Sequence, residues 1–277
     1  MTSESRATHS RLLLDTTLQV DRVKSADRLK YISSLTSGYD FAVSTGISLL
    51  EFKAVVIQEC ITIHNALRRS GARFTAVRDQ LLESNHRQQK LRAHIFNNYL
   101  QVFQASSFEI TESLDQTHAE GARILLAIHI PRLYTNFRRA VDFVIDEPVR
   151  CNRANEPPEL KRAAFATNLP KCRRGVNKTC KVEDLAREHI GMLDEVLRSV
   201  EEPSEQLCRA AELVRSLKDN PTADWSHDQC RRAGDCLIAM EAQKHATHAA
   251  STNVAEWGPL SHVFGFEFVH VRYPNLR

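Results

Sequence analysis

Short apolar runs of strand length lie near both ends of this chain, and the long stretch between them has helical spacing. Leu12 to Leu14 form a continuous apolar run, which is typical of a strand buried on both faces of a parallel sheet. Further strands are predicted over 41–45, 248–252 and 264–271. Helical spacing lies beside these strands at 26–35, 48–67 and 233–245. The two ends together predict one α/β domain whose central parallel sheet is flanked by helices and divided in the sequence.

The middle of the chain is predicted to be a mostly α-helical insertion, 70–219, into an α/β domain made of 11–69 and 220–277. Apolar residues recur there at helical steps from Leu81 to Phe143, which indicates long amphipathic helices packed as a hairpin. Pro131 is expected to kink one of these helices or to begin a new one. Two further helices are predicted, over 182–197 and 204–217.

A basic segment over 150–181 contrasts with the rest of the chain. It holds nine Lys or Arg and two Glu, whereas the formal net charge of all 277 residues is only +3. Its prolines indicate an irregular loop. The loop is either simply solvated or binds the phosphate backbone of a nucleic acid, since clustered cations neutralise phosphates without reading sequence. The candidate substrate-binding residues are Lys171, Arg173, Arg174, Lys178 and Lys181.

Several classes of protein are excluded by composition. A chain of 277 residues can bury a full hydrophobic core, and its seven cysteines are odd in number without any C-x-x-C pair, which argues against a disulfide framework. The longest apolar stretch, 124–133, is interrupted by polar residues and a proline, so no membrane span is expected. The first residues lack the apolar core of a signal peptide, and we therefore expect a cytoplasmic protein.

Zinc is not favoured by the spacing of soft ligands. The cysteines at 151, 172 and 180 and His189 are irregularly spaced, which favours reduced thiols. His245 and His248 are three residues apart, but a third ligand with fitting spacing is missing. A surface or capping role is expected for this histidine pair.

Three acidic residues are placed where a parallel sheet presents its ligand site. Asp15 follows the first predicted strand, and Glu51 and Asp235 lie near the starts of predicted helices. Carboxyl ends of parallel strands meet at one edge of the sheet, where converging carboxylates would bind Mg²⁺ or Mn²⁺. Taken singly, each acid can equally be a turn or helix-capping residue.

Four short segments also carry a resemblance to a known family. They are Leu12-Leu13-Leu14-Asp15-Thr16-Thr17, the run from Ala42 to Phe52, the run from Gly234 to Ala242, and Ser251-Thr252-Asn253-Val254-Ala255-Glu256-Trp257. In this order they resemble the strand and helix motifs of PIN-domain nucleases. The resemblance implies a PIN-like sheet and a catalytic set comprising Asp15, Glu51, Asp235 and Asn253. It covers the two ends of the chain and leaves the middle unexplained.

The resemblance also implies an activity. PIN-like nucleases are divalent-metal-dependent endoribonucleases, so this chain is expected to hydrolyse phosphodiester bonds of single-stranded RNA through a metal-activated water. Asp15, Glu51 and Asp235 would bind the Mg²⁺ or Mn²⁺ ion, while Thr16, Ser251 and Glu256 would orient the carboxylates or a water. At the fourth position this chain has the neutral Asn253, followed by Glu256 three residues later.

Two other functions are compatible with the same residues. The first is a catalytically inactive PIN-like scaffold that binds RNA or a protein partner through its helical insertion, which can also form a homodimer surface. The neutral Asn253 favours this alternative, because the loss of one charge weakens metal binding. The second is the toxin of a toxin and antitoxin pair, which is compatible with ribonuclease activity.

Overall fold

A computed structural model of the chain describes residues 9–69, 71–83, 89–104, 111–161, 164–166, 180–220 and 222–274. Its central feature is a five-stranded sheet in which every neighbouring pair of strands is parallel. In sheet order the strands are β3 (Phe143–Ile145), β2 (Phe41–Thr45), β1 (Arg11–Leu14), β6 (His248–Ser251) and β7 (Glu267–His270). The chain therefore has an α/β fold, as the strand-length runs at its two ends predict.

The chain divides into two compact units. Unit 1 comprises Met1–Glu51, Arg138–Asn155 and Cys172–Arg277, and unit 2 comprises Phe52–Phe137 and Glu156–Lys171. These bounds differ from the division predicted above. Residues 172–219, placed there in the insertion, belong to the unit that contains the sheet, whereas 52–69 belong to unit 2.

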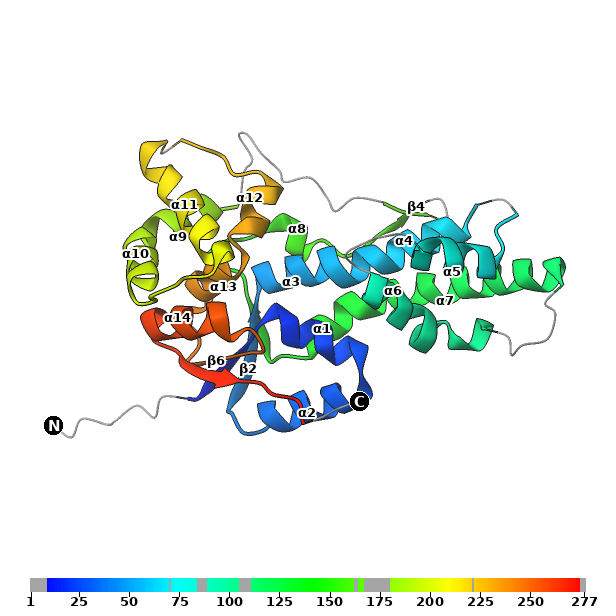
Figure 1. Cartoon of the computed structure of the whole chain (residues 1–277), viewed down its shortest axis with the longest axis horizontal. Helices are drawn as coiled ribbons and strands as arrows, with labels where there is room; N and C mark the ends of the chain where they lie inside the picture. Colours follow the sequence, from blue (N-terminus) through cyan, green and yellow to red (C-terminus); the bar gives the residue numbers. More distant parts are fainter. Residues whose placement is uncertain are drawn as a thin grey trace. The chain divides into compact units, whose positions relative to one another are not determined.

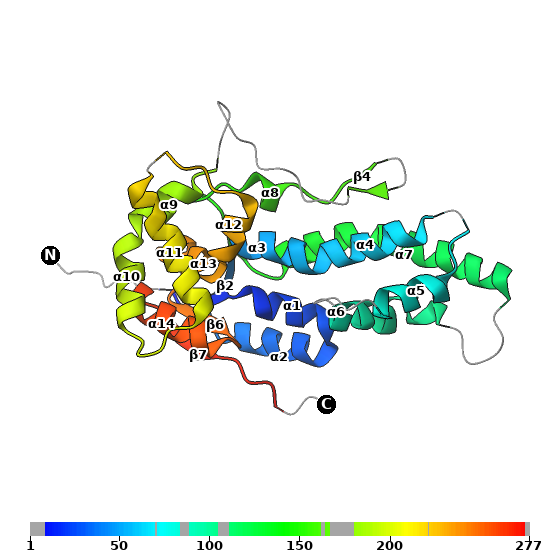
Figure 2. The ribbon, with the colours of Figure 1, turned by 45° about the horizontal axis from the view of Figure 1, so that its top comes forward.

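Helices cover both faces of the sheet in unit 1. On one face, α1 (Thr16–Lys24) and α2 (Ala26–Thr36) contribute Leu18 and Ile32 to a buried cluster with Leu12, Leu14 and Ala250. On the other face, α13 (Gly234–Ala242) packs against β2, and α14 (Val254–Phe264) against β6 and β7 (Figures 1 and 2). The remaining helices of this unit are α3 (Gly46–Phe52), α8 (Asn152–Asn155), α9 (Val182–Glu188), α10 (Ile190–Arg198), α11 (Glu205–Asp219) and α12 (His227–Arg232).

The sequence of the first strand, β1, explains why helices cover both faces of the sheet. Successive side chains of a strand point to opposite faces, and Leu12, Leu13 and Leu14 are all 0% exposed. A run without polar alternation therefore belongs in the middle of a parallel sheet, where β1 pairs with β2 and with β6. This confirms the predicted buried strand.

The middle of the chain corrects two predictions. Val141 and Phe143, read as positions of a helix, precede and begin the edge strand β3, so this stretch also contributes to the sheet. A strand of three residues is too short to show alternation, and its apolar residues continue the helical spacing before it. Pro131 starts no new helix, because α7 (Glu112–Arg139) continues through it.

Unit 2 consists mainly of helices. They are η1 (Lys53–Ile57), α4 (Gln58–Leu67), α5 (Phe74–Glu83), α6 (Gln89–His94), η2 (Ile95–Tyr99), η3 (Gln101–Phe103) and most of α7. A buried ion pair joins α4 to α6, in which Arg92 Nε donates to Glu59 Oε2 at 2.7 Å. The Asp115 carboxylate of α7 accepts hydrogen bonds from the backbone N–H and the hydroxyl of Thr75 in α5.

The predicted basic loop contains regular structure in its described parts. The helix α8 lies within it, and β4 (Leu160–Lys161) pairs antiparallel with β5 (Ala164–Phe165). The expectation of a wholly irregular segment is therefore wrong. The prolines at 157 and 158 lie between α8 and β4 and interrupt only that short stretch. Among the helices of the described residues, none combines the length and the hydropathy needed to cross a membrane.

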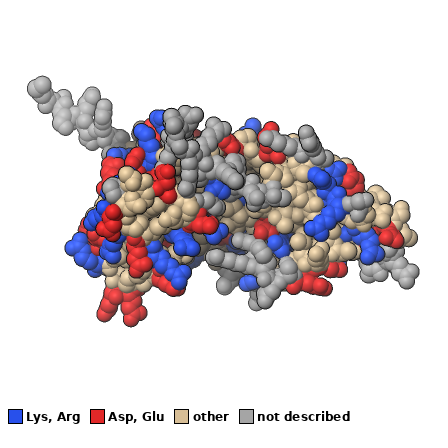
Figure 3. Space-filling view, turned by 90° about the horizontal axis from the view of Figure 1, so that it is seen from above, with Lys and Arg blue, Asp and Glu red and all other residues tan. Residues whose placement is uncertain are grey.

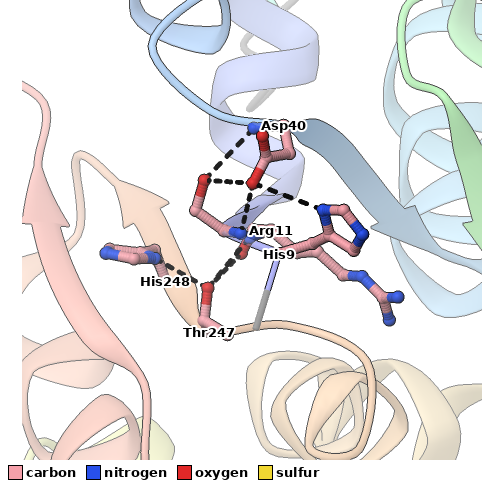
Figure 4. Close-up of polar contacts among 6 residues, drawn as sticks. His9, Arg11, Asp40, Thr247 and His248 are labelled. Carbon is pink, nitrogen blue, oxygen red and sulfur yellow. Dashed lines mark hydrogen bonds and ion pairs between the residues drawn. The ribbon is translucent and has the colours of Figure 1, made fainter. Parts of the chain in front are cut away.

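Polar contacts join the amino ends of the strands (Figure 4). The Asp40 carboxylate accepts the backbone N–H and the hydroxyl of Ser10, and Thr247 Oγ1 accepts the Arg11 N–H at 2.9 Å. The neighbouring His248 lies 2.8 Å from the Thr247 hydroxyl and 3.0 Å from the Glu267 carboxylate. These contacts join the starts of β1, β2, β6 and β7 at the edge opposite the predicted acids.

Candidate active site

Asp15 is the most constrained acid at the carboxyl edge of the sheet. It follows β1, is 1% exposed and caps the start of α1. Its carboxylate accepts the Thr16 N–H at 2.5 Å, the Thr17 hydroxyl at 2.7 Å and the Ser251 hydroxyl at 2.7 Å. Burial raises the pKa of Asp15, and these hydrogen bonds oppose that rise by favouring the charged form.

The topology explains why these residues meet. From β1 the chain proceeds to β2 and β3 on one side, and it returns to β6 on the other side of β1. Such a reversal of strand order is where open α/β sheets bind ligands, beyond the carboxyl ends of the strands. Asp15 follows β1 and Ser251 ends β6, so their hydrogen bond spans this switch point.

Glu51 reaches the same place from α3. Thr16 Oγ1 donates to Glu51 Oε2 at 2.7 Å, whereas the hydroxyl of the next residue, Thr17, donates to Asp15. The first two residues of α1 therefore hold two different carboxylates. Burial raises the pKa of Glu51 to about 7, and the negative charges of Asp15 and Glu256 add to this rise. The Thr16 hydroxyl and the charge of Arg231 act in the opposite direction. The side chain keeps partial exposure, so water can reach it.

Asp235 and Glu256 complete the group of acids. Asp235 lies in the first turn of α13, and Glu256, 7% exposed, lies in the first turn of α14. Burial raises the pKa of Asp235 well above its usual range, followed by the charge of Asp15 and a hydrogen bond with Glu256. Two carboxylates this close repel each other, and a bound cation would offset that repulsion.

The structure thus gathers six of the predicted residues around one position. The acids are Asp15, Glu51, Asp235 and Glu256, and the hydroxyls are those of Thr16 and Ser251. Asn253 joins them through its backbone, whose N–H donates to Ser251 Oγ at 2.9 Å. Its side chain makes no capping hydrogen bond at the start of α14. Glu256, not Asn253, therefore supplies the carboxylate beside Asp235.

A cation that was not predicted from the sequence also lies near this group. Arg231 lies at the end of α12, and its charge lowers the pKa of Glu51. Its side chain is 62% exposed and lies 4.0 Å from Asp228. The signal in the sequence was a basic pair, Arg231 and Arg232, just before Asp235.

The predicted phosphate-binding cations are described only in part. Four of them, Lys171, Arg173, Arg174 and Lys178, lie outside the described residues. Lys181 lies at the start of α9, where its N–H donates to the Val149 carbonyl at 2.9 Å. On the face seen in Figure 3, basic and acidic side chains are interspersed across the described surface.

The donor set suits a hard divalent cation. The side chains are carboxylates and hydroxyls, and oxygen ligands are those that Mg²⁺ and Mn²⁺ prefer. The raised pKa values of Glu51 and Asp235 reflect burial and mutual repulsion, which a bound cation would offset. Among the residues that the structure describes, no group of three or more His, Cys, Asp or Glu side chains lies close enough together to hold a metal ion as the side chains stand.

Comparisons of this chain with protein-family models, with curated proteins and with solved structures found no match.

Proposed function

We propose that this chain is a PIN-like, divalent-metal-dependent endoribonuclease. The observation that carries the proposal is a group of four mutually repelling carboxylates, from Asp15, Glu51, Asp235 and Glu256, at the switch point of a parallel sheet. Burying like charges together is costly unless they bind a cation. The four motifs, in their order along the chain, also resemble those of PIN-domain nucleases.

Each side chain has a role in this proposal. Asp15 is held in one orientation by Thr17 and Ser251, and Glu51 is oriented by Thr16. A bound Mg²⁺ or Mn²⁺ would acidify a water and stabilise the charge that develops on the phosphate. The carboxylates would bind and orient this cation, with Glu256 beside Asp235.

Single-stranded RNA is the proposed substrate. Arg231 and Arg232 are exposed beside the acids and can neutralise backbone phosphates without reading sequence. The basic residues around Lys171 are proposed to add to this electrostatic attraction. Unit 2, which has no carboxylate in the group, is proposed to bind RNA or a protein partner, and the place of action is proposed to be the cytoplasm.

The test is cleavage of single-stranded RNA by the purified chain with Mg²⁺ or Mn²⁺ and with EDTA. Asp15→Asn and Asp235→Asn are expected to abolish metal-dependent cleavage while the thermal transition is retained. Asp219→Asn is the matched control, because Asp219 is exposed at the end of α11. Equal cleavage by Asp15→Asn and the parent would remove the assigned site.

The inactive scaffold is the second candidate function. The specific observation in its favour is that Asn253 replaces an acid where PIN nucleases carry one. The structure offers Glu256 close to that position, which supports the active enzyme. RNA binding that persists in EDTA without any cleavage in Mg²⁺ or Mn²⁺ would instead support the scaffold.

A further inference from the structure

A second pair of carboxylates lies two strands away from Asp15. Asp146 follows β3, and Glu241 lies near the end of α13. Glu241 is 1% exposed, and its Oε2 atom accepts the backbone N–H of Ile47 at 3.2 Å. The other oxygen of Glu241, Oε1, is buried and has no hydrogen-bond partner.

Gly46 leaves a space that both carboxylates face. A Cβ atom on residue 46 would lie 2.5 Å from Asp146 Oδ1 and 3.4 Å from Glu241 Oε1. Both oxygens therefore point to the same position beside the α-carbon of Gly46. Any side chain larger than hydrogen would fill this space.

Both carboxylates accept hydrogen bonds, but Glu241 Oε1 has no partner within hydrogen-bonding distance. Asp146 Oδ1 accepts the Cys151 N–H at 3.2 Å, and Asp146 Oδ2 accepts the Asn155 amide. Burial raises the pKa of Glu241 to about 8, and the charge of Asp146 adds to this rise, whereas hydrogen bonds from the Ile47 N–H, the Thr45 side chain and the Gly46 N–H oppose it. A buried acceptor without a donor is costly, and a second carboxylate facing it adds to that cost.

We infer that Asp146 Oδ1 and Glu241 Oε1 hold a hard divalent cation, with water completing its coordination shell. One or two protein carboxylates with several retained waters are typical of Mg²⁺ sites. Asp146 is only half-buried, which gives an ion and its waters access from solvent. Arg138 and Arg150 balance part of the Asp146 charge, so the ion must compete with them.

This site is separate from the acids around Asp15, but it shares two helices with them. Gly46 begins α3, which carries Glu51, and Glu241 lies on α13, which carries Asp235. An ion between Asp146 and Glu241 would tie β3 to both helices. The inference does not depend on the proposed nuclease activity.

The test counts bound Mn²⁺ by calorimetry and electron paramagnetic resonance in the full chain. The background is the double variant Asp15→Asn with Asp235→Asn, which removes the first site. We expect one Mn²⁺ to remain bound in it, and to be lost when Glu241→Gln is added. Gln retains an oxygen for the Ile47 N–H. Glu188→Gln is the control, because that carboxylate is exposed and lies 3.5 Å from Lys244.

Two further variants keep the inference testable if Glu241→Gln does not fold. Asp146→Asn removes the other ligand, and Gly46→Ala fills the space between the oxygens while leaving both carboxylates in place. Each should remove the remaining Mn²⁺. The inference is overturned if the double variant binds no Mn²⁺. It is also overturned if the Mn²⁺ of the double variant remains bound after Glu241→Gln is added. Should Glu241→Gln not fold, Mn²⁺ that remains bound after Asp146→Asn or Gly46→Ala overturns it instead. If the double variant retains one Mn²⁺ and does not cleave RNA, the result supports this site. That support holds even if the parent chain proves not to be a nuclease.

Discussion

Glu51 Oε1 lies so close to the α-carbon of Gly234 that a Cβ atom on residue 234 would collide with it. Gly234 begins α13, one residue before Asp235. Gly46, which begins α3, lies close to Asp146, and a Cβ atom there would stand 2.5 Å from Asp146 Oδ1 and 3.4 Å from Glu241 Oε1 of α13. Each of these two helices thus begins with a glycine beside a carboxylate that a larger residue would displace.

Gly234→Ala is expected to displace the Glu51 carboxylate and to weaken metal binding. A methyl group there must push Glu51 away from its hydrogen bond with Thr16. Loss of such positioning typically lowers metal affinity about 10–100-fold, and we expect a change of that size in Mn²⁺ titration. Gly258→Ala in α14 is the control, because a Cβ atom there meets nothing within 4 Å. Equal Mn²⁺ affinity for Gly234→Ala and the parent would contradict this role of Gly234.

Glu256→Gln and Asn253→Ala are expected to separate the two candidates for the fourth position. Glu256 is hydrogen-bonded to Asp235, so its neutralisation should lower both Mn²⁺ affinity and RNA cleavage. Asn253→Ala should leave both close to the parent, because Asn253 contributes its backbone N–H, which alanine retains. Titration with Mn²⁺ and the cleavage assay measure the two variants side by side. A larger loss in Asn253→Ala would reverse the assignment.

His64 is expected to make unit 2 less stable in mild acid. Its ring is fully buried, Nδ1 lies 2.9 Å from Asn65 Oδ1, and burial lowers its pKa. In the unfolded chain the ring takes up a proton near pH 6.5, whereas the folded state resists it. The stabilising effect is therefore complete above pH 6.5 and is lost as pH falls towards the lower folded pKa.

Denaturant unfolding of the parent and His64→Gln from pH 8 to pH 5 measures this effect. The glutamine side chain can keep a hydrogen bond to Asn65, but it does not titrate. The free energy of unfolding should fall with decreasing pH more steeply in the parent than in the variant. Parallel curves across this range would show that His64 takes up its proton equally in the folded and unfolded states.

Local patterns in the sequence predicted most elements of the sheet. The apolar run at Leu12 to Leu14 became β1, and the predicted strand over 41–45 became β2 with the same bounds. The same patterns placed Asp15, Glu51 and Asp235 at strand ends or on adjoining helices. These features are local, because burial on both faces and helical spacing leave marks within a few residues.

The tertiary structure decided the remainder. Pairing of β3 with β2, the contact of Glu256 with Asp235, and the space that Asp146 and Glu241 share at Gly46 join residues far apart in the chain. A strand of three residues is too short to show an alternating pattern. An acid in the first turn of a helix can be read from the sequence, but the residues that it faces in the fold cannot. Sequence spacing therefore indicated which residue types were present, while packing of α3, α13 and α14 around the sheet determined which of them meet.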